Sequence, residues 1–395
     1  MKNSPRYAWL PVMSLALAAF TFSTSEFLPV ALLSDIGQSF HYPATKVGVM
    51  ITLYAWGVSL TSLPCMLLTR HMDRKKLVLR AFILFILSHL LSALAWNFTV
   101  LMISRIGVAI AHAIFWAITA SIAMRIAPAG GKTKALSMLV LGTSLAAILG
   151  LPCGRILNEL FNWRMAFVII GLLALVGFVI LKRQLPALTS QNSDVLGAFP
   201  LLLKQPALVM CYWLMLLLTA AHFCAYGYIE PFISRVAHGS SSLTTAILFV
   251  FGIAGILASS LFSSLNRYPF MFLAGSIALQ AVATFLLLPL SSSPVMLLGL
   301  SLLWGMAMTW IALALQLRIL DMAHDAADLA TSLYSTVYNV GVGAGALLGQ
   351  QVAQHVGITH IGEVAALLAF IGLGCYYLFS WRQAMRHSLT HHNLP

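Results

Sequence analysis

The stretch LMISRIGVAIAHAIFWAITA (residues 101–120) is apolar along almost its whole length, yet it contains Arg105 and His112. About twenty predominantly apolar residues are what a helix needs to cross the ~30 Å hydrocarbon core of a bilayer. The stretch therefore predicts a membrane-spanning helix. A charged side chain inside such a helix is costly, by about 2.5–3.5 kcal/mol on insertion scales, and usually has both a partner and a function.

The whole chain has the composition of a membrane protein. Of its 395 residues, 60% are hydrophobic and 8% are charged, whereas about 25% are charged in ordinary soluble domains. The net charge of +12 comes from Lys and Arg in short loops between apolar runs. No basic stripe is interleaved with aromatic residues, as binding of a single strand would require. We expect lipid as the solvent and no nucleic-acid partner.

Twelve apolar runs emerge when a window of ~19 residues is moved along the chain. They lie near residues 8–33, 46–69, 77–96, 99–124, 135–158, 163–183, 207–232, 243–265, 269–289, 294–318, 328–352 and 361–381. The first run is longer than the ~7–15 residues of a signal-peptide core, so it is interpreted as a retained span. The predicted fold class is an all-α membrane protein with twelve transmembrane helices.

The basic residues predict the orientation. With both termini in the cytoplasm, 17 of the 22 Lys and Arg residues lie inside and three lie outside, at Lys46, Arg164 and Arg235. Arg105 and Arg155 fall within spans. Because cytoplasmic loops carry an excess of Lys and Arg, this topology is favoured over its inverse.

The twelve runs divide into two halves. The longest polar connection lies between runs six and seven and is rich in Pro, Ser, Asn and Gln, as expected of a linker. Weak internal similarity supports the division, since two glycines eight residues apart occur in run five and again in run eleven. We predict six-helix halves at 1–185 and 207–395, with a cytoplasmic linker at 186–206.

No pattern indicates a metal site, a cofactor or an active site. The five cysteines lie inside apolar runs, with no CxxC or Cys/His ligand spacing. No connection exceeds about 25 residues, and neither an HExxH nor a GxSxG motif occurs. An intramembrane enzyme and a receptor or scaffold with a large soluble surface are therefore disfavoured.

Glu26 is the expected partner of Arg105. In the predicted topology, Glu26 lies roughly 12 Å from the outer end of its run and Arg105 roughly 9 Å from the outer end of its own. Two interpretations remain: a static ion pair between two helices, or a carboxyl that exchanges a proton during transport. Burial favours the neutral carboxyl and a nearby arginine favours the ionised one. A change in their separation could therefore load and release a proton.

Other polar or aromatic side chains in the runs are candidates for proton transfer or for substrate contact. His112 lies two helical turns after Arg105 and could relay protons, contact the substrate, or bond another helix. The same alternatives apply to His222. The candidates for substrate contact are Tyr54, Trp116, His222, Tyr226, Glu230, Tyr338 and Asn339, although single aromatics can equally be packing residues.

Two further features are expected to be structural. Arg155 and Glu159 are four residues apart and predict a local ion pair within one helix. Small residues allow helices to approach closely, and in a transporter such contacts are also sliding surfaces. These conformational packing residues are Gly142, Gly150, Pro152, Gly154, Gly341, Gly345 and Gly349.

Several motifs resemble those of the major facilitator superfamily. LMISRIGVAIAHA resembles its fourth-helix motif, LGLPCGR (149–155) resembles the antiporter motif of helix five, and FNWRMAF (161–167) resembles the entry to helix six. TSEFLPVALLSDIGQSF, SRIGVAIAHAIFWAITAS and YNVGVGAGALLGQQV resemble SotB-type sugar efflux transporters, and this likeness extends over essentially the whole chain. One departure is MLLTRHMDRKK (66–76), where Asp73 is displaced from the usual glycine-rich loop pattern.

The resemblance implies proton-driven efflux of sugars, with arabinose, lactose and thiogalactosides as substrate classes. It implies that Arg105 and Glu26 take part in proton coupling. We therefore expect a monomeric exporter in a bacterial inner membrane, whose partners are the bilayer, protons and a small neutral solute. The alternative retained is a proton-coupled exporter of amphipathic drugs, because a drug site can be mostly aromatic and apolar.

Overall fold

The computed structural model describes residues 5–69, 71–128, 131–188, 204–323 and 327–392, and every regular element these residues form is a helix. The predicted all-α class is confirmed. Most of the predicted linker lies outside the described residues, so its boundaries stay a prediction.

Helices of the first half follow the predicted runs. They are α1 (Pro5–Phe40), the short α2 (Ala44–Val47), α3 (Val49–Leu68), α4 (Arg74–Ala93), α5 (Phe98–Ile126), α6 (Lys132–Leu145), the π-helical turn η1 (Ala146–Gly150), α7 (Leu151–Leu160) and α8 (Trp163–Gln184). Run five is one continuous span made of α6, η1 and α7.

The second half repeats this plan. Its helices are α10 (Pro206–Tyr226), α11 (Ile229–Arg235), α12 (Ser241–Leu265), α13 (Pro269–Phe285), α14 (Pro294–Met322), α15 (Ala327–Val352), the short η3 (Ala353–Gly357) and η4 (Ile358–His360), and α16 (Ile361–His392). Run seven comprises α10 and α11.

Among the described residues, nine helical segments are long and apolar enough to cross a membrane. The last of these, Ser332–Arg382, contains both α15 and α16. The two remaining predicted runs are occupied by α3 and by α13, which is 17 residues long. Each of the twelve predicted runs therefore corresponds to a helical segment.

Side-chain caps fix the start of several helices. Asn97 accepts a hydrogen bond from the Val100 amide at 2.8 Å, and Asn162 accepts one from the Met165 amide at 3.1 Å. Ser240 and Ser293 cap α12 and α14 in the same way. Such caps satisfy amides that have no partner inside the helix. All four lie at the end of the molecule where α2 lies, here called the α2 end.

Close helix packing depends on the predicted glycines. A Cβ at Gly142 would lie 2.2 Å from the Ala16 carbonyl oxygen of α1, and one at Gly150 would lie 2.6 Å from Thr24. In the second half, a Cβ at Gly345 would lie 2.4 Å from the Ala220 carbonyl oxygen of α10. Only glycine permits this approach, so α1 packs against run five as α10 packs against α15.

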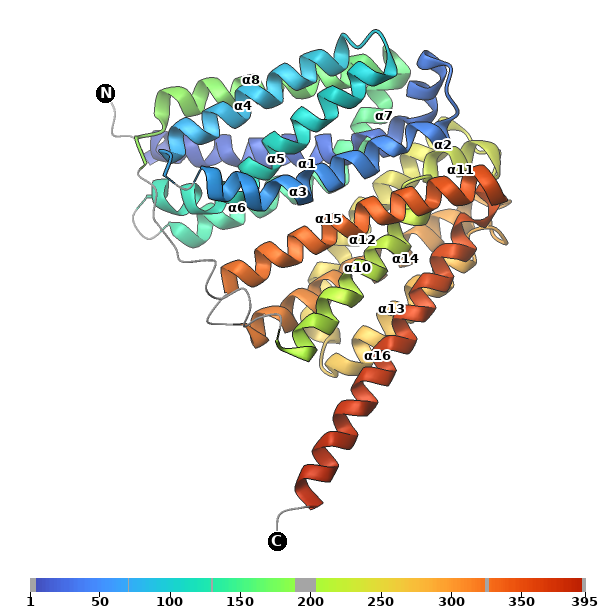
Figure 1. Ribbon diagram of the computed structural model, residues 1–395. Helices are drawn as coiled ribbons and strands as arrows, with labels where there is room; N and C mark the ends of the chain where they lie inside the picture. Colours follow the sequence, from blue (N-terminus) through green and yellow to red (C-terminus); the bar gives the residue numbers. More distant parts are fainter. Residues whose placement is uncertain (1–4, 70, 129–130, 189–203, 324–326, 393–395) are drawn as a thin grey trace.

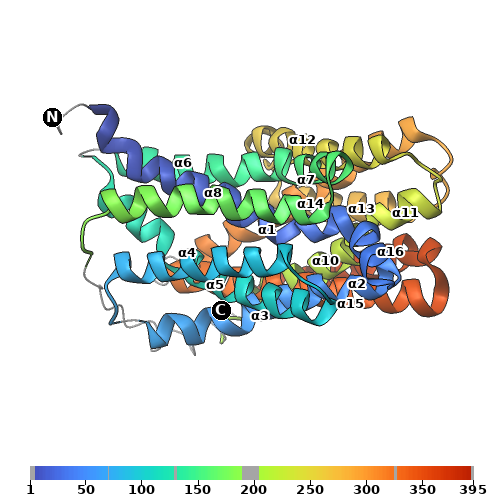
Figure 2. The ribbon, with the colours of Figure 1, turned by 90° about the horizontal axis from the view of Figure 1, so that it is seen from above.

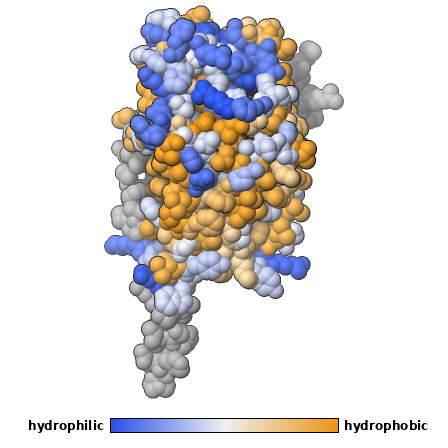
Figure 3. Space-filling view, turned by 90° about the vertical axis from the view of Figure 1, so that its right-hand side faces the viewer, coloured by the Kyte–Doolittle hydropathy of each residue, from blue (hydrophilic) through white to orange (hydrophobic). Residues whose placement is uncertain are grey.

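The two halves lie side by side, with the first half in the upper part of Figure 1 and the second half below it. Seen from above, the helices of both halves run along one common direction (Figure 2). Apolar residues cover much of the face shown in Figure 3, and hydrophilic residues gather at its upper end. Large apolar side chains such as Leu60 and Val295 are exposed, as expected where lipid is the solvent.

Hydrogen bonds between the halves join α3 to α15. The Trp56 indole donates to the Val340 carbonyl at 3.2 Å, and the Thr52 hydroxyl donates to the Gly343 carbonyl at 3.1 Å. Ser59 makes a similar bond to the Thr336 carbonyl. Because α3 begins at the α2 end, the bonds of Thr52 and Trp56 hold the halves together toward that end.

Candidate functional site

Two groups of polar side chains join helices of the bundle. The first, here called the central cluster, lies within the first half and consists of Ser25, Glu26, Tyr54, His89, Arg105 and His112. The second, here called the α2-end network, joins the halves and consists of Ser34, Asp35, Arg155, Glu159, Glu230 and Ser241.

Arg105 of α5 is fully buried, with 0% of its surface exposed. Its Nη2 donates to the Ser25 carbonyl at 2.8 Å, and its Nη1 donates to the Ser25 hydroxyl at 3.4 Å. The guanidinium also lies 4.7 Å from the ring centre of Tyr54 and 5.9 Å from that of Phe167. Aromatic faces stabilise a desolvated cation, and these contacts make its burial tolerable.

The predicted ion pair between Arg105 and Glu26 is not formed in this structure. Instead, Glu26 Oε2 lies 3.8 Å from His112 Nε2, while Arg105 bonds the preceding residue, Ser25. Successive side chains on a helix point about 100° apart, so Ser25 and Glu26 present themselves to different neighbours. Glu26 remains within electrostatic range of Arg105.

His112 connects a hydroxyl to a carboxyl group. Its Nδ1 lies 2.8 Å from the Tyr54 hydroxyl, and its Nε2 faces Glu26, whose side chain is 12% exposed. A neutral imidazole has one donor and one acceptor nitrogen. Tyr54 and His112 are hydrogen-bonded, and a shortening of the 3.8 Å gap between His112 and Glu26 would extend this row to the carboxyl group, as in proton-transferring histidines.

His89 of α4 is a member of the central cluster that the sequence analysis missed. It is 0% exposed, and its Nε2 lies 2.8 Å from the Ser25 hydroxyl. The signal was present, because a histidine within an apolar run is the same feature that singled out His112 and His222.

An aromatic cluster lies in the second half. His222 stacks on Tyr226 with ring centres 4.8 Å apart, and its ring centre lies 5.2 Å from that of Trp304 and 6.2 Å from that of Phe251. His222 Nδ1 and Trp304 Nε1 are buried without a hydrogen-bond partner in the protein. Phe251 and Trp304 were not predicted, because aromatics in an apolar run carry no local signal of a shared site.

The other substrate-contact candidates have the following contacts. The Trp116 ring centre lies 6.1 Å from that of His112. Tyr338 of α15 contacts Phe223 edge to face and is within electrostatic range of Glu26. Asn339 donates to the Ser335 carbonyl, and its Oδ1 is buried without a partner. Glu230 is not near them, since it belongs to the α2-end network.

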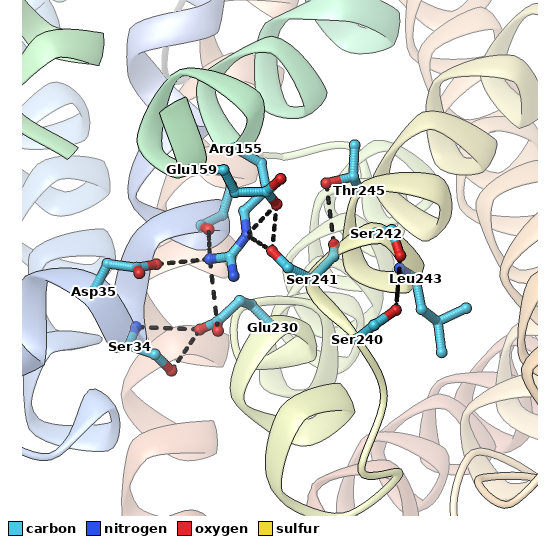
Figure 4. Close-up of polar contacts among 11 residues, drawn as sticks. Ser34, Asp35, Arg155, Glu159, Glu230, Ser240, Ser241, Ser242, Leu243 and Thr245 are labelled. Atoms are coloured by element: carbon cyan, nitrogen blue, oxygen red, sulfur yellow. Dashed lines mark hydrogen bonds and ion pairs between the residues drawn. The ribbon is translucent and has the colours of Figure 1, made fainter. Parts of the chain in front are cut away.

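Arg155 is the centre of the α2-end network (Figure 4). Its Nη1 lies 2.6 Å from Asp35 Oδ2 of α1, and its Nε donates to the Ser241 hydroxyl of α12 at 2.9 Å. The predicted local pair with Glu159 is present at 3.6 Å, and Arg155 has further partners in other helices. Its guanidinium also reaches Glu230 of α11 at 3.8 Å, because α7 ends beside the second half.

Glu230 completes the link between the halves. It is 2% exposed, and its Oε2 accepts hydrogen bonds from the Ser34 amide at 3.1 Å and from the Ser34 hydroxyl at 2.8 Å. Ser241 in turn donates to Glu159. Ser34 of α1 and Arg155 and Glu159 of α7 are thereby bonded to residues of α11 and α12, and opening this end of the molecule requires breaking these bonds.

Metal-ligating residues do not gather anywhere in the part of the chain that the structure describes.

Asp73, in the loop before α4, has a structural role. It caps α4 by accepting a hydrogen bond from the Lys76 amide at 3.0 Å, and it accepts another from the Leu188 amide at 2.8 Å. At its shifted position in the loop sequence, Asp73 thus bonds Leu188, in the segment that follows α8.

The arrangement of helices is similar to that of known transporter structures. One is a bacterial homologue of the human lysosomal transporter Spinster in an inward-facing, unoccupied conformation, with a TM-score of 0.74 and 15% identity over 95% of this chain and 97% of that one. The inward-facing, occupied form gives a TM-score of 0.75 at 14% identity, covering 96% of this chain and 98% of that one.

The sequence itself matches a family. The profile of the Major Facilitator Superfamily matches residues 15–346, which include the central cluster, the α2-end network and most of the second half. Together with the two six-helix halves, this match places the protein among multi-span membrane transporters. The chain belongs to the Major Facilitator Superfamily.

Proposed function

We propose that the protein exports a small neutral solute, a sugar in the first instance, in exchange for protons by alternating access. The observation that carries the proposal is the central cluster. Glu26 is a largely buried carboxyl that faces His112 at 3.8 Å and lies near the cation of Arg105. Ionisable residues at membrane depth mark proton relays and ion pathways by default.

The chemistry of proton exchange follows from the surroundings of Glu26. Burial favours the neutral carboxyl, whereas a nearby cation such as Arg105 favours the carboxylate. A movement that changes the distances to Arg105 and His112 therefore changes the affinity of Glu26 for a proton. Binding on one side of the membrane and release on the other then couples transport to the proton gradient.

The aromatic cluster supports a neutral, ring-shaped substrate. His222, Tyr226, Phe251 and Trp304 carry no formal charge when the imidazole is neutral, and two of their polar atoms lack partners. Binding sites for small molecules combine apolar walls with a few placed polar groups. Aromatic rings stack on the apolar faces of sugar rings, and the two unpaired polar atoms are groups of the kind that bond sugar hydroxyls.

An amphipathic drug is the second candidate. The same four rings give more apolar than polar surface, which is the specific feature that favours a drug over a sugar. The resemblance to SotB-type sugar efflux transporters favours the sugar.

We further propose that the protein acts as a monomer in a bacterial inner membrane with both termini in the cytoplasm. In this orientation the α2 end faces the outside of the cell, and the bonds between the halves at that end close the substrate pathway on the outer side. Closure of the outer end by these bonds supports the proposal that this state is open toward the cytoplasm.

Flux into sealed proteoliposomes tests the proposed function. An imposed pH gradient is expected to drive accumulation of radiolabelled arabinose, lactose or a thiogalactoside well above its equilibrium level, and a protonophore is expected to abolish it. An amphipathic cation in parallel vesicles distinguishes the two substrate classes. If neither class moves against its gradient, the proton-coupled mechanism is wrong.

Removal of Arg155 is expected to loosen the α2 end. Arg155→Ala leaves Glu230 buried without its cation, and breaking a buried charge pair costs about 3–5 kcal/mol. Even a third of that amount would shift the balance between inward- and outward-facing states about tenfold. The measurement is the rate of labelling of a single cysteine placed at position 229 in a cysteine-free variant; Ile229 is 1% exposed in the closed arrangement, so the rate is expected to rise.

Glu159→Gln is the matched control for this change, since Glu159 is 40% exposed and contributes one peripheral contact. It is expected to alter labelling little. Equal labelling in wild type and Arg155→Ala would show that the network does not close the gate.

A further inference from the structure

The two neighbours of the His89 ring determine which of its nitrogens donates a hydrogen bond and which accepts one. Its Nδ1 lies 2.9 Å from the Phe85 carbonyl oxygen, which can only accept, so Nδ1 carries the hydrogen. In the neutral ring, Nε2 is therefore an acceptor, and the Ser25 hydroxyl 2.8 Å away donates to it. This fixes the direction in which the Ser25 hydrogen points.

The orientation of the Ser25 hydroxyl also determines how it bonds Arg105. With its hydrogen committed to His89, the Ser25 oxygen presents lone pairs to Arg105 Nη1 at 3.4 Å, while the Ser25 carbonyl accepts from Nη2 at 2.8 Å. Hydrogen bonds that run in one direction strengthen one another. Two helices, α1 and α4, thus hold the guanidinium of a third, α5.

The ring of His89 lies beside one cation and one hydroxyl group. Arg105 from α5 is the charged neighbour, Ser25 faces it from α1, and Phe167 of α8 lies with its ring centre 6.0 Å away. A second positive charge beside Arg105 in an apolar interior would be repelled and poorly solvated. A protonated ring would also turn Nε2 into a donor and break the bond from Ser25.

Arg105 is held at less than its full bonding capacity. Its Nε is buried and has no hydrogen-bond partner in this structure. A rotation of the Arg105 side chain could give Nε a partner. The carboxylate of Glu26 is a candidate for this partner, because Glu26 directly follows Ser25, the residue that Arg105 already bonds. The guanidinium is bonded instead by the Ser25 carbonyl at 2.8 Å and by the Ser25 hydroxyl at 3.4 Å, and that hydroxyl is in turn bonded to His89.

We propose that His89 is a positioning residue for proton coupling: through Ser25 it holds Arg105 away from direct contact with Glu26. The inference rests on the proposed function, since it specifies how one cation is tuned against one carboxyl group. Without His89, Ser25 is free to reorient, Arg105 moves onto Glu26, and the carboxylate is stabilised more strongly. Loading of a proton then requires a lower pH.

The test is the pH profile of proton-driven accumulation in proteoliposomes for His89→Ala and Ser25→Ala. Both changes are expected to move the midpoint of the profile to more acidic pH, by about 0.5–1 unit. The double variant is expected to move it no further, because residues acting through one chain are not additive. His89→Gln keeps an acceptor and a donor at this position and is expected to restore much of the wild-type profile.

Exposed His360, which pairs with Glu363 at the surface of the protein, supplies the control variant His360→Ala. Substrate exchange without a gradient shows that each variant is folded. If His89 only fills space, turnover falls in the alanine variants but the midpoint stays at its wild-type position, and the inference is wrong. If wild type itself shows no proton-driven accumulation, it is the proposed function that fails.

Discussion

Glu26→Gln is expected to abolish accumulation of substrate against its gradient while leaving exchange down a gradient measurable. Glutamine has nearly the size of a protonated glutamate, so the helices still pack, but it can neither release nor take up a proton. The change removes the only carboxyl group of the central cluster. Uphill flux at saturating substrate is expected to fall to the level of empty vesicles, and counterflow exchange is the measurement of retained binding.

Glu363→Gln provides a matched control, because it removes one carboxyl from a side chain that is 45% exposed. Its uphill flux is expected to equal that of wild type. A Glu26→Gln protein that still concentrates its substrate would exclude Glu26 as the coupling group.

Arg105→Ala is expected to move the pH profile of transport to more alkaline values or to stop turnover. Without the cation, Glu26 is a largely buried carboxyl with only His112 to stabilise its ionised form, so it keeps its proton until the pH is higher. The direction is opposite to that expected for His89→Ala. Fluxes are compared at several pH values and at equal amounts of reconstituted protein.

Arg105→Lys separates charge from geometry. Lysine restores a positive charge but not the planar fork by which Arg105 bonds both the hydroxyl and the carbonyl of Ser25. A partial return of the profile toward wild type is therefore expected. A profile of Arg105→Ala identical to wild type would reduce the arginine to a packing residue.

The fold could be predicted from the sequence because the signal is local. A run of about twenty apolar residues predicts a span wherever it stands in the chain, and each predicted run corresponds to a helical segment. The candidate residues were found for a similar reason, since a charge such as Arg105 is conspicuous in an apolar run. Depth along the helix follows from counting residues.

The partners could not be predicted, because they depend on how each helix is rotated about its axis. Ser25 and Glu26 are neighbours in sequence, yet Arg105 bonds the first while His112 faces the second. Arg155 likewise has an obvious partner four residues away, but also bonds residues from α1 and α12. Such contacts join segments far apart in the chain, and no local pattern records them.

The π-helical turn η1 changes the meaning of a spacing in run five. Two turns of regular helix use about 7.2 residues, and a π turn adds one residue, so Gly142 and Gly150 come back to nearly the same side and both meet α1. The glycines of α15 share the eight-residue interval on a regular helix, where eight residues turn the side by about 80°, yet Gly341 and Gly349 both still meet α10. The π turn therefore brings the two glycines of run five closer to one side than the same interval does in α15. A chain shortened by one residue within η1 would keep its hydropathy and its helix, yet would turn Arg155 about 100° away from the partners that close the gate.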